Sequence, residues 1–160
     1  MILDAWPTFG NQECMAKLDE SGKLIEILRI PAHTTRYVQP LDLGFNMLWK
    51  TMKKKFDDHI VMKGINITAA VRDRELKIHP LIHNQFSNAR FVDVIKYAWF
   101  TSGWLTQRPP RFTTPAQFCF RRLPVKCGED NCTQRSFIRC AHCEKLLCFQ
   151  QFYFDFHTHF

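Results

Sequence analysis

The sequence predicts an α/β domain followed by helices and a small cysteine-rich module at the C-terminal end. Two short apolar segments bounded by loop signals predict strands, and two stretches with apolar side chains at helical spacing predict helices. Cysteines and histidines gather in residues 127–160. A chain of 160 residues has room for one ordinary domain, or for a smaller domain and one such module.

The first predicted strand is Met1–Leu3, an apolar segment that ends at Asp4 and is followed by loop signals. Asp4 is therefore expected at the C-terminal edge of a strand. A second strand is predicted over residues 24–30, where β-branched and partly alternating side chains end at Pro31.

A helix is predicted over residues 41–56, because Pro40 suits a helix start and apolar side chains recur along one face. The apolar stripe consists of Phe45, Leu48 and Met52. Asp42 lies in the first turn, where the helix dipole favours a carboxylate whether or not it has another role.

The second half of the predicted domain has a less regular pattern. Residues 60–88 are polar with scattered apolar positions and predict no definite element. A second amphipathic helix is predicted over residues 91–99, with Gly103 as its C-cap. A proline-rich segment follows and indicates a linker. The predicted organisation is a domain over 1–107, a linker over 108–126 and a module over 127–160.

Charge is unevenly distributed along the chain, whose net charge is +7. Residues 1–45 carry four basic and six acidic side chains, residues 46–126 carry fifteen and five, and residues 127–160 carry three and four. The middle segment is therefore a basic block. Such a block attracts a polyanion such as nucleic acid through release of phosphate counterions, and a solvated lysine face is the alternative.

The composition argues against a membrane protein and against a secreted disulfide scaffold. No segment approaches the roughly 20 apolar residues that cross a membrane, so we expect no membrane partner. The opening residues lack the basic flank and apolar stretch of a secretory signal. Seven cysteines, an odd number without such a signal, are expected to be reduced, and this favours metal binding.

Two sequence patterns surround Asp4 and Asp42. The first acid lies in ILDAW (2–6), and the second lies in QPLDLG (39–44), which follows PAHTT (31–35). The two acids are separated by 37 residues. Together these patterns resemble the DDE-type transposases of the pogo, Tigger and jerky group within the mariner superfamily, and QPLDLG is the most specific part.

The resemblance covers about residues 1–105 and implies a ribonuclease-H-like fold with three acids at one edge of a mixed sheet. It implies that Asp4 is the second catalytic acid and Asp42 the third, holding Mg²⁺ or Mn²⁺. Such ions activate a water or a 3′-hydroxyl and stabilise the leaving oxygen during DNA cleavage and strand transfer. The first acid is expected well before Asp4. The domain is therefore predicted to be incomplete, and the chain alone to be inactive.

Five cysteines and two histidines in the C-terminal segment predict a zinc site. The candidate ligands are Cys127, Cys132, Cys140, Cys143, Cys148, His157 and His159. Zinc prefers tetrahedral thiolate and imidazole ligands, and so short a module needs a metal for stability. Unrelated buried cysteines would leave the histidines unexplained.

The tail is similar to the cysteine-rich ends of some of these transposases, and its spacing resembles a cross-brace around two zinc ions. The first implied site consists of Cys140, Cys143, His157 and His159. Three ligands of the second implied site are Cys127, Cys132 and Cys148. Its fourth ligand is expected near Gln151, and glutamine is a poor zinc ligand. The second site is therefore expected to be weak, to take a water, or to recruit His142.

Four phenylalanines follow the last cysteine, at positions 149, 152, 154 and 156. We expect them to pack around the metal core rather than to stack on bases. The tail itself has more acidic than basic side chains, which makes it a poor phosphate binder. Contact with a protein and recognition of a DNA end are equally open roles for it.

Three functions are compatible with these patterns. The first is an active DNA-cutting enzyme that obtains its third carboxylate elsewhere. The second is an inactive, transposase-derived protein that binds DNA through residues 46–126 and a protein partner through the tail. The third is a zinc-dependent protein-interaction module without a nucleic-acid role. The sequence favours the second, and a nuclear location follows from a DNA partner.

Overall fold

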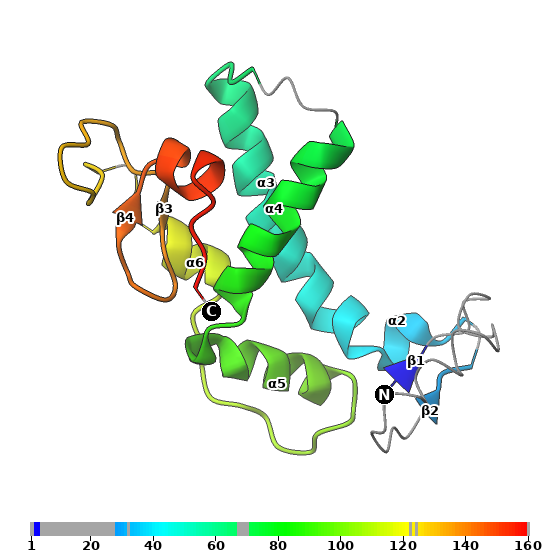
Figure 1. Cartoon of the computed structure of the whole chain (residues 1–160). Coiled ribbons are helices and arrows are strands. Elements are labelled where there is room, and N and C mark those ends of the chain that lie inside the picture. The colour runs from blue at the N-terminus through cyan, green and yellow to red at the C-terminus, as the bar shows by residue number, and fades with distance from the viewer. Residues whose placement is uncertain are drawn as a thin grey trace, which may run out of the picture. The chain divides into compact units, whose positions relative to one another are not determined.

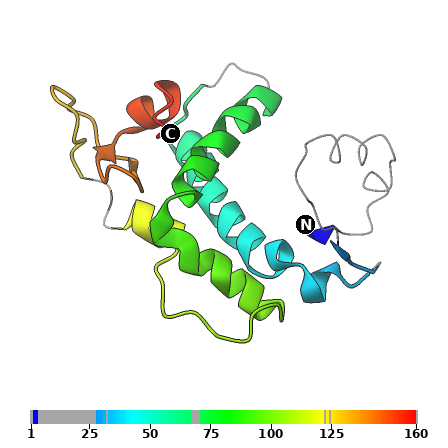
Figure 2. The same cartoon turned by 60° about the horizontal axis from the view of Figure 1, so that its bottom comes forward.

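The computed structural model describes residues 2–3, 28–31, 33–66, 71–121, 123 and 125–159. Helices dominate these residues, and two small two-stranded sheets accompany them (Figure 1, Figure 2). The chain is therefore mixed but mainly helical, and the ribonuclease-H-like fold stays a prediction. Among the described helices, none is both long and apolar enough to cross a membrane.

The chain divides into two compact units. The first lies within Met1–Asn46 and Lys96–Pro109, and the second lies within Met47–Ile95 and Pro110–Phe160. Each unit thus combines segments that are distant in the sequence. The cysteine-rich tail shares the second unit with two long helices.

The first unit contains a parallel strand pair. Strand β1 (Ile2–Leu3) pairs with β2 (Leu28–Arg29), with Ile2 opposite Leu28. Strands are thus present within both predicted segments. Asp4 lies outside the described residues, so its expected place at the end of β1 stays a prediction.

The helix predicted over residues 41–56 is present but begins differently. Helix α2 (Thr35–Val38) is followed by a π-helical turn, η2 (Leu41–Phe45), which leads directly into α3 (Asn46–Met62). The indole of Trp104 holds the end of α2 by donating to the Val38 carbonyl at 2.7 Å. The QPLDLG pattern therefore lies at a tightly packed entry to a long helix.

Gly44 in this entry lies directly against α5 (Val92–Thr101). A Cβ atom added to Gly44 would lie 3.1 Å from the Cβ of Ala98 and 3.2 Å from its Cα. These separations are shorter than ordinary van der Waals contact, so a larger residue would push the two backbones apart. The glycine of the pattern therefore has a packing role.

Gly44→Ala is expected to destabilise the first unit by about 1–3 kcal/mol, the usual cost of overpacking a tight contact. Denaturant unfolding of the full chain measures this loss. The double variant Gly44→Ala with Ala98→Gly removes one of the clashing methyl groups and should show a favourable coupling energy. Additive losses in the double variant would contradict the close approach.

In the second unit, α3 packs against α4 (Val71–Phe86). Trp49 of α3 stacks on His79 of α4 with ring centroids 5.7 Å apart, and Lys53 pairs with Glu75 at 3.2 Å. The core side chains of these two helices are Met52, Phe56, Ile60, Ile78, Leu81, Ile82 and Phe86. Of the predicted apolar stripe, only Met52 belongs to this core. The buried face of α3 extends from Met52 through Phe56 to Ile60.

The tail forms two short strands and a final π-helical turn. Strand β3 (Ile138–Arg139) pairs antiparallel with β4 (Leu146–Leu147), and η4 (Gln150–Phe154) follows. Ahead of them, the segment expected as a linker contains α6 (Pro115–Phe120). Thr114 and Gln117 form a capping box that starts α6, and such reciprocal capping stabilises a short helix.

Candidate metal centre

The four ligands implied for the first site come together at one end of the second unit. The ligand atoms of Cys140, Cys143, His157 and His159 all lie within 4.8 Å of one another. Cys143 Sγ is 3.5 Å from His157 Nε2, which is 2.9 Å from His159 Nε2. Tetrahedral zinc, with Zn–S bonds of about 2.3 Å and Zn–N bonds of about 2.0–2.1 Å, places neighbouring ligand atoms roughly 3.3–3.8 Å apart. The cluster is therefore close in size to a tetrahedral zinc site.

A tight turn between β3 and β4 presents the two thiols of this cluster. The Cys140 N–H donates to the Lys145 carbonyl at 2.9 Å, and the Glu144 N–H donates back to the Cys140 carbonyl at 3.0 Å. Glu144 has a positive φ of 61°, which closes the turn. Cys140 is buried and Cys143 is exposed, so the site lies at the surface.

Two buried polar residues of α4 anchor the histidine side of the cluster. Asn84 donates to the His159 carbonyl at 2.5 Å and accepts from the His159 N–H at 3.1 Å. The neighbouring Gln85 accepts from the Ala141 N–H at 2.6 Å. Neither residue can be recognised from the sequence, because a polar side chain on a helix gives no sign of a partner more than 50 positions away.

The second cluster gathers Cys127, Cys132 and Cys148, whose sulfur atoms also lie within 4.8 Å of one another. Gln151 occupies the fourth side. Its Oε1 accepts hydrogen bonds from the Cys127 thiol at 2.7 Å and from the Cys148 thiol at 3.3 Å. The cluster therefore offers three sulfur ligands and one amide oxygen.

The idea that His142 completes the second cluster is wrong in this structure. Its Nε2 lies 2.6 Å from the Asn84 carbonyl oxygen, and its ring stacks on His159 with centroids 5.1 Å apart. His142 thus belongs to the surroundings of the first cluster. Gln151 takes the position that the sequence spacing assigned to it.

Burial affects the thiols of the two clusters differently. It raises the pKa of Cys140, and it raises the pKa of Cys148 to about 11. Burial also acts to raise the pKa of Cys127, but hydrogen bonds from the Glu129 and Cys148 N–H groups outweigh it and lower that pKa. A thiol must lose its proton to bind a metal. Cys127 is therefore better prepared for ligation than Cys148.

The surroundings of His157 in the first cluster favour the form of imidazole that binds a metal ion. Burial, together with the neighbouring His159, lowers the pKa of His157. A neutral imidazole is the form that donates a lone pair to zinc. The first cluster thus combines two thiols with an imidazole whose surroundings favour its neutral form, and it could hold a metal such as zinc.

An ion-pair network braces the turn that carries Cys140 and Cys143. Glu144 accepts from Arg90 at 2.7 Å and also pairs with Arg139. The two guanidinium groups lie over the ring of Phe118, with the Arg90 carbon 4.1 Å from the ring centroid. Hydrogen bonding to Arg90, with Arg139 beside it, lowers the pKa of Glu144. The network links the turn to α6 and to the short 3-10 helix η3 (Ala89–Phe91) that precedes α5.

Cys119 is a buried thiol outside both clusters, on α6. Burial raises its pKa to about 12 from an ordinary 9.0. The folded state disfavours the thiolate. The contribution of Cys119 to the free energy of unfolding is therefore fully present below pH 9 and is lost as the pH rises toward 12.

At pH 8 we therefore expect Cys119 to react with iodoacetamide only through unfolding, since the thiolate is the reactive form. Mass spectrometry of the alkylated peptide, with and without denaturant, measures this. A native reaction rate equal to that in denaturant would contradict the burial of this thiol.

Of the two predicted catalytic acids, the structure describes only Asp42. Asp42 is exposed in η2 and accepts from the Asn46 amide at 2.8 Å, an arrangement that suits a helix entry. Asp4 lies outside the described residues. The pairing of Asp4 with Asp42 around a divalent ion therefore stays a prediction.

Residues 99–159 match the family model described as the Tc5 transposase C-terminal domain. The match includes both clusters and all seven candidate ligands. Searches of curated proteins and of solved structures give no match. The finding supports a transposase-related family, on a part of the chain that barely overlaps residues 1–105.

Proposed function

We propose that this chain is a transposase-derived nucleic-acid-binding protein whose C-terminal module folds around zinc. The observation that carries the proposal is the four-ligand cluster inside the segment that matches a transposase C-terminal domain. Two thiols and two imidazoles form a donor set typical of structural zinc. When bound, zinc supplies folding energy to the small module rather than a reactive group.

Nucleic-acid binding is supported by unpaired positive charge in the second unit. The lysine run at 53–55 contributes less than its sequence suggests, because Lys53 pairs with Asp57 at 2.8 Å and Lys54 pairs with Asp58 at 3.3 Å. Among the described residues of this unit, several exposed cations have no acidic partner. They include Lys50, Lys55, Lys63, Arg72, Arg111, Arg121, Lys126 and Arg135. These side chains are free to approach phosphates.

The finer assignments belong to the same proposal. The first part of the chain is a derivative of a pogo, Tigger or jerky DDE domain with a ribonuclease-H-like origin. Asp4 and Asp42 would hold Mg²⁺ or Mn²⁺ when a further acid completes the site. A DNA partner places the protein in the nucleus, and the zinc module is available for a protein partner.

The zinc-loaded chain is expected to bind duplex DNA with an affinity that falls steeply with salt. The logarithm of the binding constant should decrease with the logarithm of the salt concentration by about 0.9 per phosphate contacted. Fluorescence anisotropy of a labelled duplex at several salt concentrations measures the slope. Absence of binding, or binding that salt leaves unchanged, would instead favour the zinc-dependent interaction module without a nucleic-acid role.

A further inference from the structure

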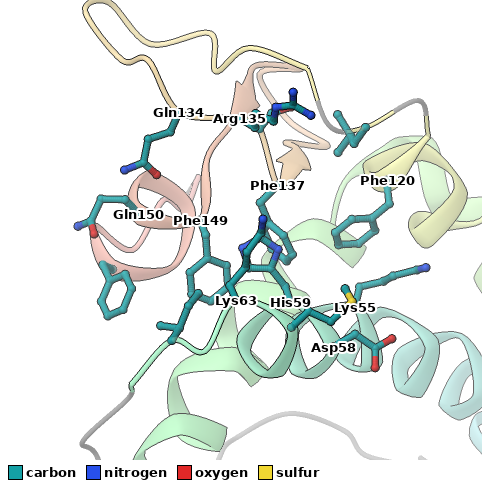
Figure 3. Close-up of a pocket in the computed structure, with 15 residues that line it drawn as sticks. Lys55, Asp58, His59, Lys63, Phe120, Gln134, Arg135, Phe137, Phe149 and Gln150 are labelled. Carbon is teal, nitrogen blue, oxygen red and sulfur yellow. The ribbon is translucent and has the colours of Figure 1, made fainter.

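A second feature of this unit is a cavity that neither metal cluster uses. It has a volume of about 780 Å³ and lies between the C-terminal half of α3, the end of α6 and the tail (Figure 3). Small-molecule sites typically measure about 300–1,000 Å³, so the cavity is large enough for a nucleotide. We name it the aromatic pocket, after the rings of His59, Phe120, Phe137, Phe149 and Phe154 that line it.

Three of these rings pack against one another in the wall of the aromatic pocket, and Phe137 meets Phe149 edge-on with ring centroids 5.0 Å apart. The His59 centroid lies 4.6 Å from that of Phe137 and 4.8 Å from that of Phe149, and the planes of His59 and Phe149 are within 24° of parallel. Burial, with Lys63 nearby, lowers the pKa of His59. The wall of the pocket at this point is therefore aromatic, with Phe137 and Phe149 largely buried, so the ring most open to stacking with a ligand is Phe154, which is 40% exposed.

Apolar side chains that line the pocket are also unusually exposed. Phe154 is 40% exposed and Met62 is 77% exposed. Of the four C-terminal phenylalanines, Phe149 and Phe152 are buried, whereas Phe154 and Phe156 are exposed, so the expectation that all four pack around the metal core is wrong for Phe154 and Phe156. Water contacts this apolar surface in the free protein, and a stacked ligand would remove it from water.

Three cations border the aromatic pocket and have no acidic partner among the described residues. They are Lys55, Lys63 and Arg135. The carboxylate that also lines the pocket, Asp58, is paired with Lys54 at 3.3 Å. The lining thus combines aromatic faces with a net positive charge, as do the sites where proteins hold single-stranded nucleic acid.

From these contacts we propose that the aromatic pocket binds an unpaired nucleotide of a DNA strand. Its base stacks against the rings, and its flanking phosphates approach Lys55, Lys63 and Arg135. The inference rests on the proposed nucleic-acid function and adds a specific site to it. An apolar peptide would fill the apolar floor but would leave the three cations without an anion, so the charge favours a nucleotide over such a peptide.

The test compares a short thymidine oligonucleotide with an abasic strand of the same length, using fluorescence anisotropy and the zinc-loaded full chain. Removing the bases should weaken binding about tenfold, the size of one base–aromatic stacking contact. A duplex of the same length serves as a probe of the charge alone.

Two phenylalanines offer a matched pair of variants. Phe154 and Phe156 are 40% and 39% exposed, and Lys77 lies over both rings, but only Phe154 lines the pocket. Phe154→Ala should reduce the tenfold preference to about threefold or less, and Phe156→Ala should preserve it. Zinc content of each variant confirms that the module is folded. Lys55→Ala with Lys63→Ala should weaken binding to both strands equally and lower the salt slope by about 1–2.

The outcomes separate the pocket from the broader function. Duplex binding with a steep salt slope, but equal affinity for the thymidine and abasic strands, overturns the pocket and leaves the proposed function intact. Equal effects of Phe154→Ala and Phe156→Ala on the preference also overturn it. Absence of binding to duplex and to both strands overturns the proposed function and the pocket together.

Discussion

The Cys143→Ser variant is expected to lose its tight zinc ion and, with it, the fold of the C-terminal module. Structural zinc contributes apparent binding energies of about 10–16 kcal/mol, as large as the roughly 5–15 kcal/mol that stabilises a whole domain. Loss of a ligand should weaken zinc binding more than about 100-fold, because even outer-shell partners typically change metal affinity 10–100-fold. Competition with a chromophoric chelator measures the affinity, and amide hydrogen exchange of residues 125–159 measures the fold.

Cys143 is a suitable target because it is exposed, so serine there leaves no buried cavity. His142→Gln is the matched control. His142 is the adjacent residue, and glutamine can still donate to the Asn84 carbonyl that lies 2.6 Å from the imidazole. Because His142 stacks on His159, the control should lose some zinc affinity but far less than Cys143→Ser, and it should keep its protection from exchange. Equal zinc affinity in both variants would contradict the assignment of the first cluster.

The Gln151→His variant is expected to raise the number of tightly bound zinc ions from one to two per chain. The Gln151 Oε1 lies 2.7 Å from the Cys127 sulfur and 3.3 Å from the Cys148 sulfur, so an imidazole there can complete the second cluster. Three cysteines with one histidine form a common structural zinc set, whereas an amide oxygen is a weak fourth ligand. Native mass spectrometry counts the ions directly.

Gln150→His provides the control for this gain. Gln150 is exposed, donates to Asp155 at 3.1 Å and takes no part in either cluster. It should keep the wild-type count of one. A wild-type chain with two equally tight ions would contradict the view that glutamine limits the second site. An equal gain in both histidine variants would show that the added histidine acts without entering the cluster.

Some elements could be predicted from the sequence because their signals are local. Apolar segments gave the strands at 2–3 and 28–29, and helical spacing gave α5, with Gly103 at a positive φ of 80° after its end. Cysteine and histidine spacing grouped the ligands of both clusters in the way that the structure brings them together. Each of these signals lies within a single stretch of the sequence, the longest being the cysteine and histidine pattern at 127–159.

Other features depend on partners far away in the sequence. Helix α4 was not predicted, because Pro80 interrupts its pattern and its buried face ends in the polar pair Asn84 and Gln85. Those residues are buried only because the tail supplies their hydrogen-bond partners. Likewise, the aromatic pocket joins His59 to Phe137 and Phe149, a contact that no local pattern contains.

The most direct measurement of the central claim is X-ray absorption at the zinc edge for the chain loaded with one equivalent of zinc. If Cys140, Cys143, His157 and His159 form the site, the spectrum should fit two sulfur ligands at about 2.3 Å and two nitrogen ligands at about 2.0–2.1 Å. A shell of oxygen and nitrogen without sulfur would contradict a transposase-related module that folds around zinc.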